Sequence, residues 1–458
     1  MNRERLISIV RNLITHPDEK QFLEICRTVP LADLADALKE QQPANIAKLF
    51  ALSPADSWAS LFTYLPNNYQ DKLLKFLPKN LIADLFAHLP SDDRADLYNR
   101  LSHLEQEQLL PALAKTKQED ILKMSSYSEG TVGSVITSDY ATVDANITIV
   151  EALEHLRLTA PSKETIYVVY VLDAERKLLG NVLLHDLILA KPTDLISNLI
   201  QQEPIFARPE WPRNQAAELI RRYDLLALPV VDNDNKMIGI LTVDDAMDIE
   251  KEDDAAQLAR FGGTASLGGP DLALRSSSFF QMFSMRFIWL AVLTFFGIIT
   301  STFVAGQTDL IEKVIILAAF MAPIVDMGGN SGSQAAALVI RAMALGEVKL
   351  SWKDIWFVIK KELPVAFALG ICIAILEVVL AFFAKGVGMD VLIVVGLSMF
   401  TITAIGGITG AMLPFLARRI GTDPATLSAP LITSIMDLLG AFIFFGFAYM
   451  MFANLLVA

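Results

Sequence analysis

Hydrophobic residues are distributed unevenly along the chain, and they form long runs only after about residue 285. Five of these runs are apolar enough and long enough to cross the roughly 30 Å hydrocarbon core of a bilayer as helices. The pattern therefore predicts a membrane region at 285–458 with five transmembrane helices. The expected spans are about 287–305, 314–340, 363–384, 391–416 and 429–457.

The loops between these spans differ in charge. Those on the side of the N-terminal part carry seven Lys or Arg residues, whereas the opposite loops carry two, Lys313 and Lys385. Because positively charged loops remain in the cytoplasm, we expect a multi-pass protein of the cell (inner) membrane with a cytoplasmic N-terminus. An odd number of spans then puts the C-terminus outside. The opening residues MNRERLISIV contain no long apolar core, which indicates no signal peptide.

Before the membrane region, residues 1–128 show a repeat of twelve residues. Leucine recurs at 65, 77, 89, 101 and 113, and the first three of these leucines are followed by proline. Proline lacks an N–H group and is tolerated where a helix begins, so each proline marks the start of another short helix. The repeat predicts an all-α N domain in which short helices stack as a superhelical array.

Residues 129–248 contain a second repeat, in which 170–187 recurs at 229–246 with an offset of 59 residues. Asp173 matches Asp232 and Gly180 matches Gly239 under this offset. Each copy is expected to form a strand, a polar turn, a second strand and a helix, preceded by an amphipathic helix. We place the first copy at 129–190 and the second at 191–248.

Acidic residues concentrate after the second copy. The stretch 244–254 contains seven carboxylates: Asp244, Asp245, Asp248, Glu250, Glu252, Asp253 and Asp254. The residue types favour a connecting helix near 245–260, within a linker region at 249–284. A face of this kind can simply be solvated, or it can hold a cation that relieves the repulsion. Because the whole net charge of −13 lies in the first 285 residues, nucleic acid is disfavoured as a partner and cations are favoured.

The last span contains a single charged residue, Asp437. A carboxylate at membrane depth costs roughly 2.5 to 3.5 kcal/mol, so it is expected to face a partner, a cavity or an ion path. Thr433 and Gly440 lie on the same small and polar helical face, which can pack closely around an ion. The alternative is a structural aspartate that bonds to a neighbouring helix.

The second span contains three glycines, Gly328, Gly329 and Gly332. We expect them to interrupt the helix, and either to expose carbonyl groups or to let two backbones approach each other.

Three segments give the chain a family resemblance. They are EGTVGSVIT at 129–137, PIVDMGGNSGSQ at 323–334 and PLITSIMDLLG at 430–440. Together with the order of the parts, they resemble the MgtE family of magnesium channels. The resemblance implies a multidomain protein: an all-α superhelical N domain, an α/β tandem CBS (Bateman) module and a five-helix transmembrane domain.

The same resemblance implies a homodimer with its pore on the two-fold axis and Asp437 at the ion site. Asn330 and the backbone around Thr433 and Gly440 would assist it. A sparse carboxylate site suits Mg²⁺, which keeps most of its water ligands. Asp326 departs from the family, whose familiar members have a small neutral residue there. It adds a second carboxylate to the pore, or it caps the local backbone.

The resemblance also implies that cytoplasmic Mg²⁺ closes the channel. The expected function is passive Mg²⁺ uptake, with Mg²⁺ as both substrate and regulator; the alternative is a CBS-regulated secondary transporter or exporter of divalent cations. We expect the sensor ligands among Asp92, Asp93, Asp96, Asp232, Asp245, Asp248, Glu252, Asp253 and Asp254. The acidic residues of the SDDRAD segment at 91–96, taken alone, are typical of a solvated first helical turn.

In CBS modules, a G-x-x-[ST]-x-x-D segment can hold the ribose of an adenine nucleotide. The second copy has Gly239, Thr242 and Asp245 at these positions, whereas the first copy has Leu183 in place of the hydroxyl residue. ATP is therefore a candidate ligand, and a fold-defining glycine with a helix cap is the alternative. No phosphate-binding loop, H-E-x-x-H segment or nucleophile with an evident partner occurs, so we do not expect an enzyme.

Overall fold

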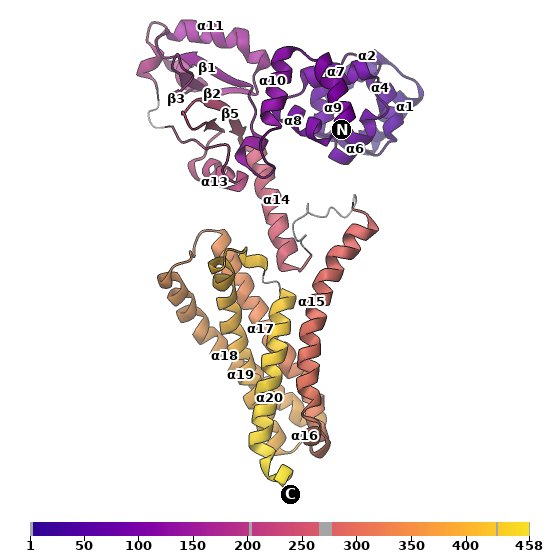
Figure 1. Ribbon diagram of the computed structural model, residues 1–458, viewed down its shortest axis with the longest axis vertical. Coiled ribbons are helices and arrows are strands. Elements are labelled where there is room, and N and C mark those ends of the chain that lie inside the picture. Colours follow the sequence, from indigo (N-terminus) through magenta and orange to yellow (C-terminus); the bar gives the residue numbers. More distant parts are fainter. Residues whose placement is uncertain (1–2, 201–203, 265–276, 427–428, 458) are drawn as a thin grey trace. The chain divides into compact units, whose positions relative to one another are not determined.

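The computed structural model describes residues 3–200, 204–264, 277–426 and 429–457. The chain divides into two compact units, Met1–Glu252 and Asp253–Ala458. The first unit contains short helices followed by two small sheets, and the second contains long apolar helices (Figure 1).

The helices of the N-terminal part are short, as the twelve-residue repeat predicts. They are α1 (Arg3–Thr15), α2 (Glu19–Thr28), α3 (Leu31–Leu38), α4 (Pro43–Phe50), α5 (Ala59–Thr63), α6 (Asn67–Leu74), α7 (Lys79–His88), α8 (Ser91–Arg100), α9 (His103–Leu109) and α10 (Lys115–Met124). Single 3₁₀ turns lie at η1 (Ala55–Ser57) and η2 (Leu110–Ala112). The all-helical prediction for this part is confirmed.

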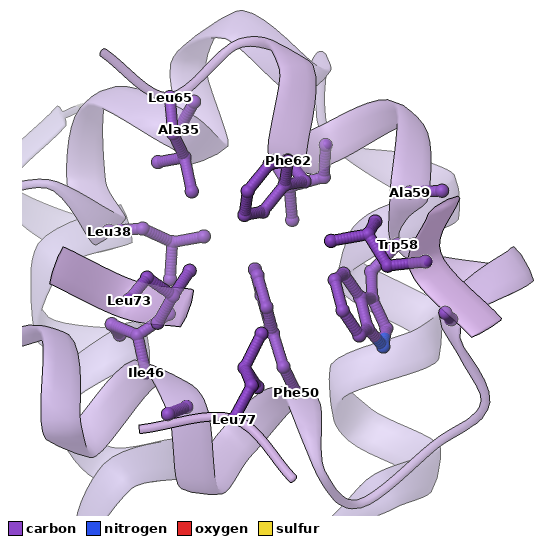
Figure 2. Packing of buried hydrophobic residues seen from close by; sticks show 14 of the residues in the cluster. Ala35, Leu38, Ile46, Phe50, Trp58, Ala59, Phe62, Leu65, Leu73 and Leu77 are labelled. Carbon is purple, nitrogen blue, oxygen red and sulfur yellow. The ribbon is translucent and has the colours of Figure 1, made fainter. Parts of the chain in front are cut away.

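Proline sets the start of the central helices. Pro66, Pro78 and Pro90 occupy the N-cap positions of α6, α7 and α8. The repeating leucine that precedes each proline is buried, and Figure 2 shows Leu65 and Leu77 in the apolar core beside Phe50, Trp58 and Phe62. The rings of Phe50 and Trp58 stack with centroids 4.3 Å apart. One leucine–proline pair therefore both ends a helix in the core and begins the next one.

The two repeated copies form two small sheets. In the first, β1 (Tyr140–Asp144) is parallel to β2 (Thr165–Leu172), which is antiparallel to β3 (Leu178–Leu183). In the second, β4 (Ala227–Val231) is antiparallel to β5 (Met237–Thr242). The flanking helices are α11 (Ile149–Thr159), α12 (Leu184–Leu189), α13 (Arg213–Tyr223) and α14 (Val243–Phe261), and 3₁₀ turns lie at η3 (Val132–Val135), η4 (Ala160–Ser162) and η5 (Ile196–Asn198). The predicted duplication and the expected acidic helix are both present.

The hairpin turns of the two copies are equivalent. Arg176 and Asn235, which differ by the offset of 59, both have a positive φ, 67° and 60° respectively. The amide of Leu178 donates to the carbonyl of Asn235 at 3.1 Å, and the amide of Met237 donates to the carbonyl of Arg176 at 3.0 Å. The repeat relates these two bonds to each other, because Leu178 corresponds to Met237 and Arg176 corresponds to Asn235. The two copies therefore join through their turns with local two-fold symmetry.

The second unit contains five helices that are long and apolar enough to cross a membrane. They are α15 (Phe279–Ala305), α17 (Ala318–Ala344), α18 (Trp352–Lys385), α19 (Met389–Arg419) and α20 (Ala429–Val457), with the short α16 (Thr308–Lys313), η6 (Ile315–Leu317) and η7 (Pro424–Thr426) between them. Of the residues in the most apolar stretch of α19, 61% are buried, whereas none are buried in the corresponding stretch of α15. Helix α19 is therefore the centre of this bundle, and α15 lies at its edge.

The expected interruption of the second span is wrong, because α17 is one continuous helix. Its glycines face neighbouring helices instead. A side chain on Gly406 or Gly410 of α19 would overlap the backbone of Gly328 or Gly332 of α17. The four glycines form two rows of small residues spaced four apart, which allow the two backbones to touch.

Candidate functional site

Asp437 lies within the membrane bundle beside a hollow of about 460 Å³. The residues that line the hollow come from α15, α17 and α20, and they include a second carboxylate, Asp326 of α17. Thr300 and Ser301 of α15 add two hydroxyl groups to the same wall. The structure thus brings together two of the pore residues predicted from the sequence, and it places them against a space rather than inside a packed core.

Close packing between α17 and α20 sets the position of Asp437. A side chain on Gly329 would lie 2.9 Å from Cγ2 of Thr433, and one on Gly440 would lie 3.3 Å from Cα of Val325. The hydroxyl of Thr433 donates to the carbonyl of Ala429 in its own helix at 3.0 Å. Thr433 and Gly440 therefore act here as packing residues on either side of Asp437, and they do not line the hollow.

Asp326 and Asn330 lie one turn apart on the exposed face of α17. The side-chain amide of Asn330 donates to Oδ2 of Asp326 at 3.0 Å. Because α17 continues through this region, Asp326 does not cap a helix end. Asn330 instead orients one oxygen of Asp326, which lines the hollow together with Asp437.

A second hollow, of about 180 Å³, lies in the first unit and is strongly acidic. Six of the nine residues predicted as sensor ligands line it: Asp92, Asp93, Asp96, Asp245, Asp248 and Glu252. Arg213 also lines it and donates to Glu252 at 2.7 Å. Among the described residues, no three carboxylate, imidazole or thiol side chains converge closely enough to hold one metal ion. The acids therefore surround a shared space but do not form a finished ligand set.

The other three predicted sensor residues have different surroundings. Asp232 closes the turn between β4 and β5, where its Oδ1 accepts from the amides of Asp234 and Lys236 at 2.9 Å each. Asp253 accepts from the side chain of Gln257 at 3.0 Å. Asp253 and Asp254 belong to the second unit.

The first turn of α8 is only partly solvated, so the expectation for the SDDRAD segment is wrong in part: Ser91 and Arg94 are buried, Asp92 and Asp93 are half-buried, and Asp96 is exposed. Ser91 is fully buried, and its Oγ accepts from the amide of Ser138 at 2.6 Å. Arg94 is also fully buried, and it donates to the carbonyl of Leu89 at 2.8 Å and to Oδ2 of Asp120 at 3.1 Å. The Ser91 bond holds α8 against the start of the first repeated copy, and the bond from Arg94 to Asp120 holds α8 against α10; Asp92, Asp93 and Asp96 of this helix line the hollow.

Burial makes negative charge expensive in this hollow. Desolvation, together with repulsion from Asp245, raises the pKa of Asp93 to about 7. Desolvation also raises the pKa of Asp245 to about 6, against the opposing effect of its hydrogen bond from Thr242. The pKa of Asp92 lies well above its usual range for the same reason, with repulsion from Asp93 second. A cation inside the hollow would offset this cost.

The candidate nucleotide residues have structural partners. The hydroxyl of Thr242 donates to Oδ2 of Asp245 at 2.5 Å, at the point where β5 passes into α14. A side chain on Gly239 would lie 2.8 Å from the carbonyl of Thr137, so this glycine allows the neighbouring backbone to approach. These contacts favour the alternative of a fold-defining glycine and a helix cap.

Comparison with known proteins agrees with this architecture. Residues 321–447 match the model of a divalent cation transporter family, MgtE; residues 29–130 match the MgtE intracellular N domain; and residues 132–192 and 196–252 match CBS domains. The magnesium transporter MgtE of Thermus thermophilus is 33% identical over 71% of each chain. The chain belongs to the MgtE family.

Further relatives support the same assignment. The magnesium transporter MgtE of Enterococcus faecalis is 30% identical over 72% of this chain and 71% of its own. The solved soluble part of a magnesium transporter is similar with a TM-score of 0.53 at 26% identity, covering 55% of this chain and 99% of its own. The cytosolic domain of an Mg²⁺ channel MgtE, solved in complex with ATP, is similar with a TM-score of 0.50 at 27% identity, covering 53% of this chain and 99% of its own.

Some residues around these two hollows in this MgtE chain were missed by sequence reasoning. Thr300 and Ser301 line the membrane hollow but lie in an ordinary apolar run. A hydroxyl group in such a run can donate its hydrogen bond within its own helix, as Thr300 does to the carbonyl of Phe296, so the sequence alone gives no sign of a site. Arg94 could have been flagged, because it is the single cation among three aspartates in SDDRAD. Only the tertiary contacts of α8 show that it is buried.

Proposed function

We propose that this chain is a channel for passive Mg²⁺ uptake that cytoplasmic Mg²⁺ closes. The observation that supports this function best is the membrane hollow, where Asp437 and Asp326 face one space between three membrane helices. A carboxylate at membrane depth is retained for a function or for a partner, and Asp437 has no hydrogen-bond partner among the described residues. The relatives named magnesium transporter MgtE supply the identity of the ion.

A homodimer would complete the site. A two-fold axis beside the exposed face of α17 would place two copies of Asp437 and two of Asp326 around one path. Asn330 would hold each Asp326 in place, while the contacts at Thr433 and Gly440 would hold α20 against α17. Mg²⁺ gives up its waters reluctantly and usually keeps several of them. A few carboxylates around a wide space therefore suit passage of a hydrated ion better than a tight cage would.

The acidic hollow of the first unit would provide the sensor. Without a cation, its carboxylates repel one another and their charged forms are poorly solvated. Mg²⁺ that binds only the compact arrangement stabilises it by mass action, in proportion to the logarithm of its concentration. Asp92, Asp93, Asp96, Asp245, Asp248 and Glu252 are the ligands that we assign to this step.

Two further assignments accompany this function. We place the N-terminus in the cytoplasm, because the loops on that side hold seven of the nine loop cations. We also keep ATP as a candidate ligand of the second CBS copy, since a related cytosolic domain was solved with ATP. Its ribose would have to compete with Thr242 for Asp245.

Uptake of Mg²⁺ into liposomes that contain the purified chain tests the proposal. Asp437→Ala is expected to reduce uptake by more than about tenfold, because it removes the negative charge that stabilises a divalent ion at membrane depth. Asp437→Asn should be nearly as poor. The matched control is Asp309→Ala, which removes an exposed carboxylate in the first turn of the short helix α16 and should leave uptake unchanged.

Undiminished uptake by Asp437→Ala would refute the pore assignment. Uptake that requires a sodium or proton gradient would instead identify the alternative, a secondary transporter. A channel moves Mg²⁺ down its own gradient in the absence of any other.

A further inference from the structure

Aromatic and basic side chains alternate along the first turns of α18. Trp352, Trp356 and Lys360 form one row of residues spaced four apart, and Lys353, Phe357 and Lys361 form the adjacent row. The three aromatic side chains are largely exposed: 77% for Trp352, 58% for Trp356 and 53% for Phe357. Large exposed rings beside lysines are unusual on a face that meets only water.

Each ring in this region has a cation over it. Nζ of Lys360 lies 5.5 Å from the ring centroid of Trp356, and Nζ of Lys361 lies 5.9 Å from that of Phe357. The guanidinium of Arg419 lies 6.0 Å from the ring of Trp352. Arg419 is the last residue of α19, so the surface extends over two helices.

The two helices meet at this end because they run antiparallel. Gly370 of α18 lies against Phe400 of α19, while Glu362, eight residues earlier, lies against Gly407. Moving toward the start of α18 therefore means moving toward the end of α19. We call the combined surface the basic–aromatic belt: Trp352, Lys353, Trp356, Phe357, Lys360, Lys361, Arg418 and Arg419.

The belt carries positive charge that no described carboxylate neutralises. In the part of the chain that the structure describes, none of its five cations forms an ion pair with a carboxylate. Asp354 lies close by in sequence, but its Oδ2 already accepts from the amide of Lys349 at 3.0 Å and from the hydroxyl of Ser351 at 2.9 Å. Five cations on one exposed surface call for an anionic partner.

Beyond the belt, α18 continues as an apolar helix that faces outward. Only 17% of its most apolar stretch is buried, and Phe367, Ile371 and Ile375 are each about half exposed. Tryptophan favours the level of lipid headgroups, and lysine reaches from the edge of the hydrocarbon toward phosphate. The belt therefore lies where a lipid headgroup would lie, directly above the surface that acyl chains would cover.

We propose that the basic–aromatic belt is a binding site for anionic phospholipids, whose phosphate groups contact its cations and whose acyl chains lie along α18. Clusters of Lys and Arg next to a transmembrane helix attract anionic lipids. A second copy of this chain is the less suitable occupant, because a two-fold contact would bring these five cations against themselves. This site lies outside the proposed ion path and does not depend on it.

Lipid binding to the full-length chain in neutral detergent tests the proposal. Phosphatidylglycerol and phosphatidylcholine would be titrated separately and followed by native mass spectrometry and by the thermal unfolding midpoint. The variant carries Lys353→Gln, Lys360→Gln and Lys361→Gln. It is expected to bind phosphatidylglycerol at least about tenfold more weakly than the unaltered chain, with phosphatidylcholine binding unchanged.

Three controls make the result specific. Lys115→Gln, Lys123→Gln and Lys177→Gln together remove the same charge from exposed positions in the first unit, and should leave lipid binding unchanged. Arginine at 353, 360 and 361 keeps the charge and should retain binding. Asp437→Ala should also retain binding, which separates this site from the proposed transport function.

Several outcomes would overturn the assignment. Equal binding by the glutamine variant, or an equal loss in the control from the first unit, would show that no such site exists. Displacement of the lipid by millimolar inorganic phosphate would identify a soluble anion as the ligand. A change in oligomeric state of the glutamine variant, measured by light scattering, would make the belt an interface between copies.

Discussion

The two acidic hollows of this chain contrast in how many charges they hold. The membrane hollow has two carboxylates among apolar and hydroxyl-bearing residues, in a space of about 460 Å³. The hollow of the first unit is smaller, about 180 Å³, and six carboxylates line it. A sparse, wide site lets a hydrated ion enter and leave, whereas a bound cation would relieve the repulsion among the carboxylates of a crowded site. The difference suits conduction in one place and sensing in the other.

The two hollows also depend on different kinds of scaffold. In the membrane, glycine rows bring the backbones of α17 and α19 together, while Asp326 and Asn330 lie on the exposed face of α17. In the first unit, a buried serine holds the acidic turn of α8 against the first CBS copy, and a buried arginine holds it against α10. Packing of small residues thus positions the carboxylates of the membrane hollow, whereas hydrogen bonds and ion pairs position those of the first unit.

The largest expected effect comes from breaking the glycine contact in the membrane. Gly410→Leu would drive a side chain into the backbone of Gly332, and should lower the stability of the second unit by about 3 kcal/mol or more. The thermal unfolding midpoint and the yield of folded protein in detergent measure this. Gly446→Leu is the matched control, because Gly446 is exposed and nothing lies within 4 Å of a Cβ atom added there, so the protein should be unaffected. Equal behaviour of the two variants would mean that α17 and α19 do not touch as described.

The same glycines show where sequence reasoning reaches its limit. Leucine and proline at a fixed spacing predicted the short helices, and the offset of 59 predicted the paired CBS copies, because both patterns repeat local structure. Glycine in an apolar span is ambiguous: it can break a helix or admit a neighbour. The choice depends on what lies opposite, here Gly406 and Gly410, which are about 80 residues away in the chain. The sequence therefore suggested an interrupted span where the structure has a continuous one.

The residues of the candidate sites could be predicted where a charged residue stands in an unusual context, either inside an apolar span or within a dense cluster of like charges. A lone carboxylate in an apolar run pointed to Asp437, and the excess of acids at 244–254 pointed to Asp245, Asp248 and Glu252, whereas Asp92, Asp93 and Asp96 were predicted only from the family resemblance. The partial burial of the SDDRAD turn could not be foreseen, because acidic residues at a helix start are usually solvated. Its burial results from contacts of Ser91 and Arg94 with residues far along the chain.

An intermediate effect is expected from removing the second carboxylate of the membrane hollow. Asp326→Asn keeps the shape of the side chain but removes one charge, and should reduce Mg²⁺ uptake about fivefold, the equivalent of roughly 1 kcal/mol for a charge interaction in a wet site. Liposome uptake at several Mg²⁺ concentrations measures this, with Asp309→Asn as the control. An effect as large as that of Asp437→Ala would contradict the view that the site is sparse and that one carboxylate dominates it.

The smallest expected effect is on the pH dependence of stability, which arises from protonation of Asp93 in the hollow of the first unit. Burial raises the pKa of Asp93 to about 7 from an ordinary value of 3.8; repulsion from Asp245, Asp96 and Glu164 adds to this effect, and Arg100 opposes it. Between these two values the folded protein binds more protons than the unfolded chain, so the free energy of unfolding without Mg²⁺ falls as pH rises from about 4 to 7.

Asp93→Asn removes this titration. In EDTA, the variant should therefore unfold a few degrees higher than the unaltered chain at pH 8 and should lose less stability between pH 5 and pH 8. The exposed Asp234→Asn serves as the control and should follow the unaltered chain. Added Mg²⁺ should stabilise the unaltered chain at pH 8 more than the variant, because the cation and the proton offset the same charge. A variant that Mg²⁺ stabilises just as much would remove Asp93 from the proposed set of sensor ligands.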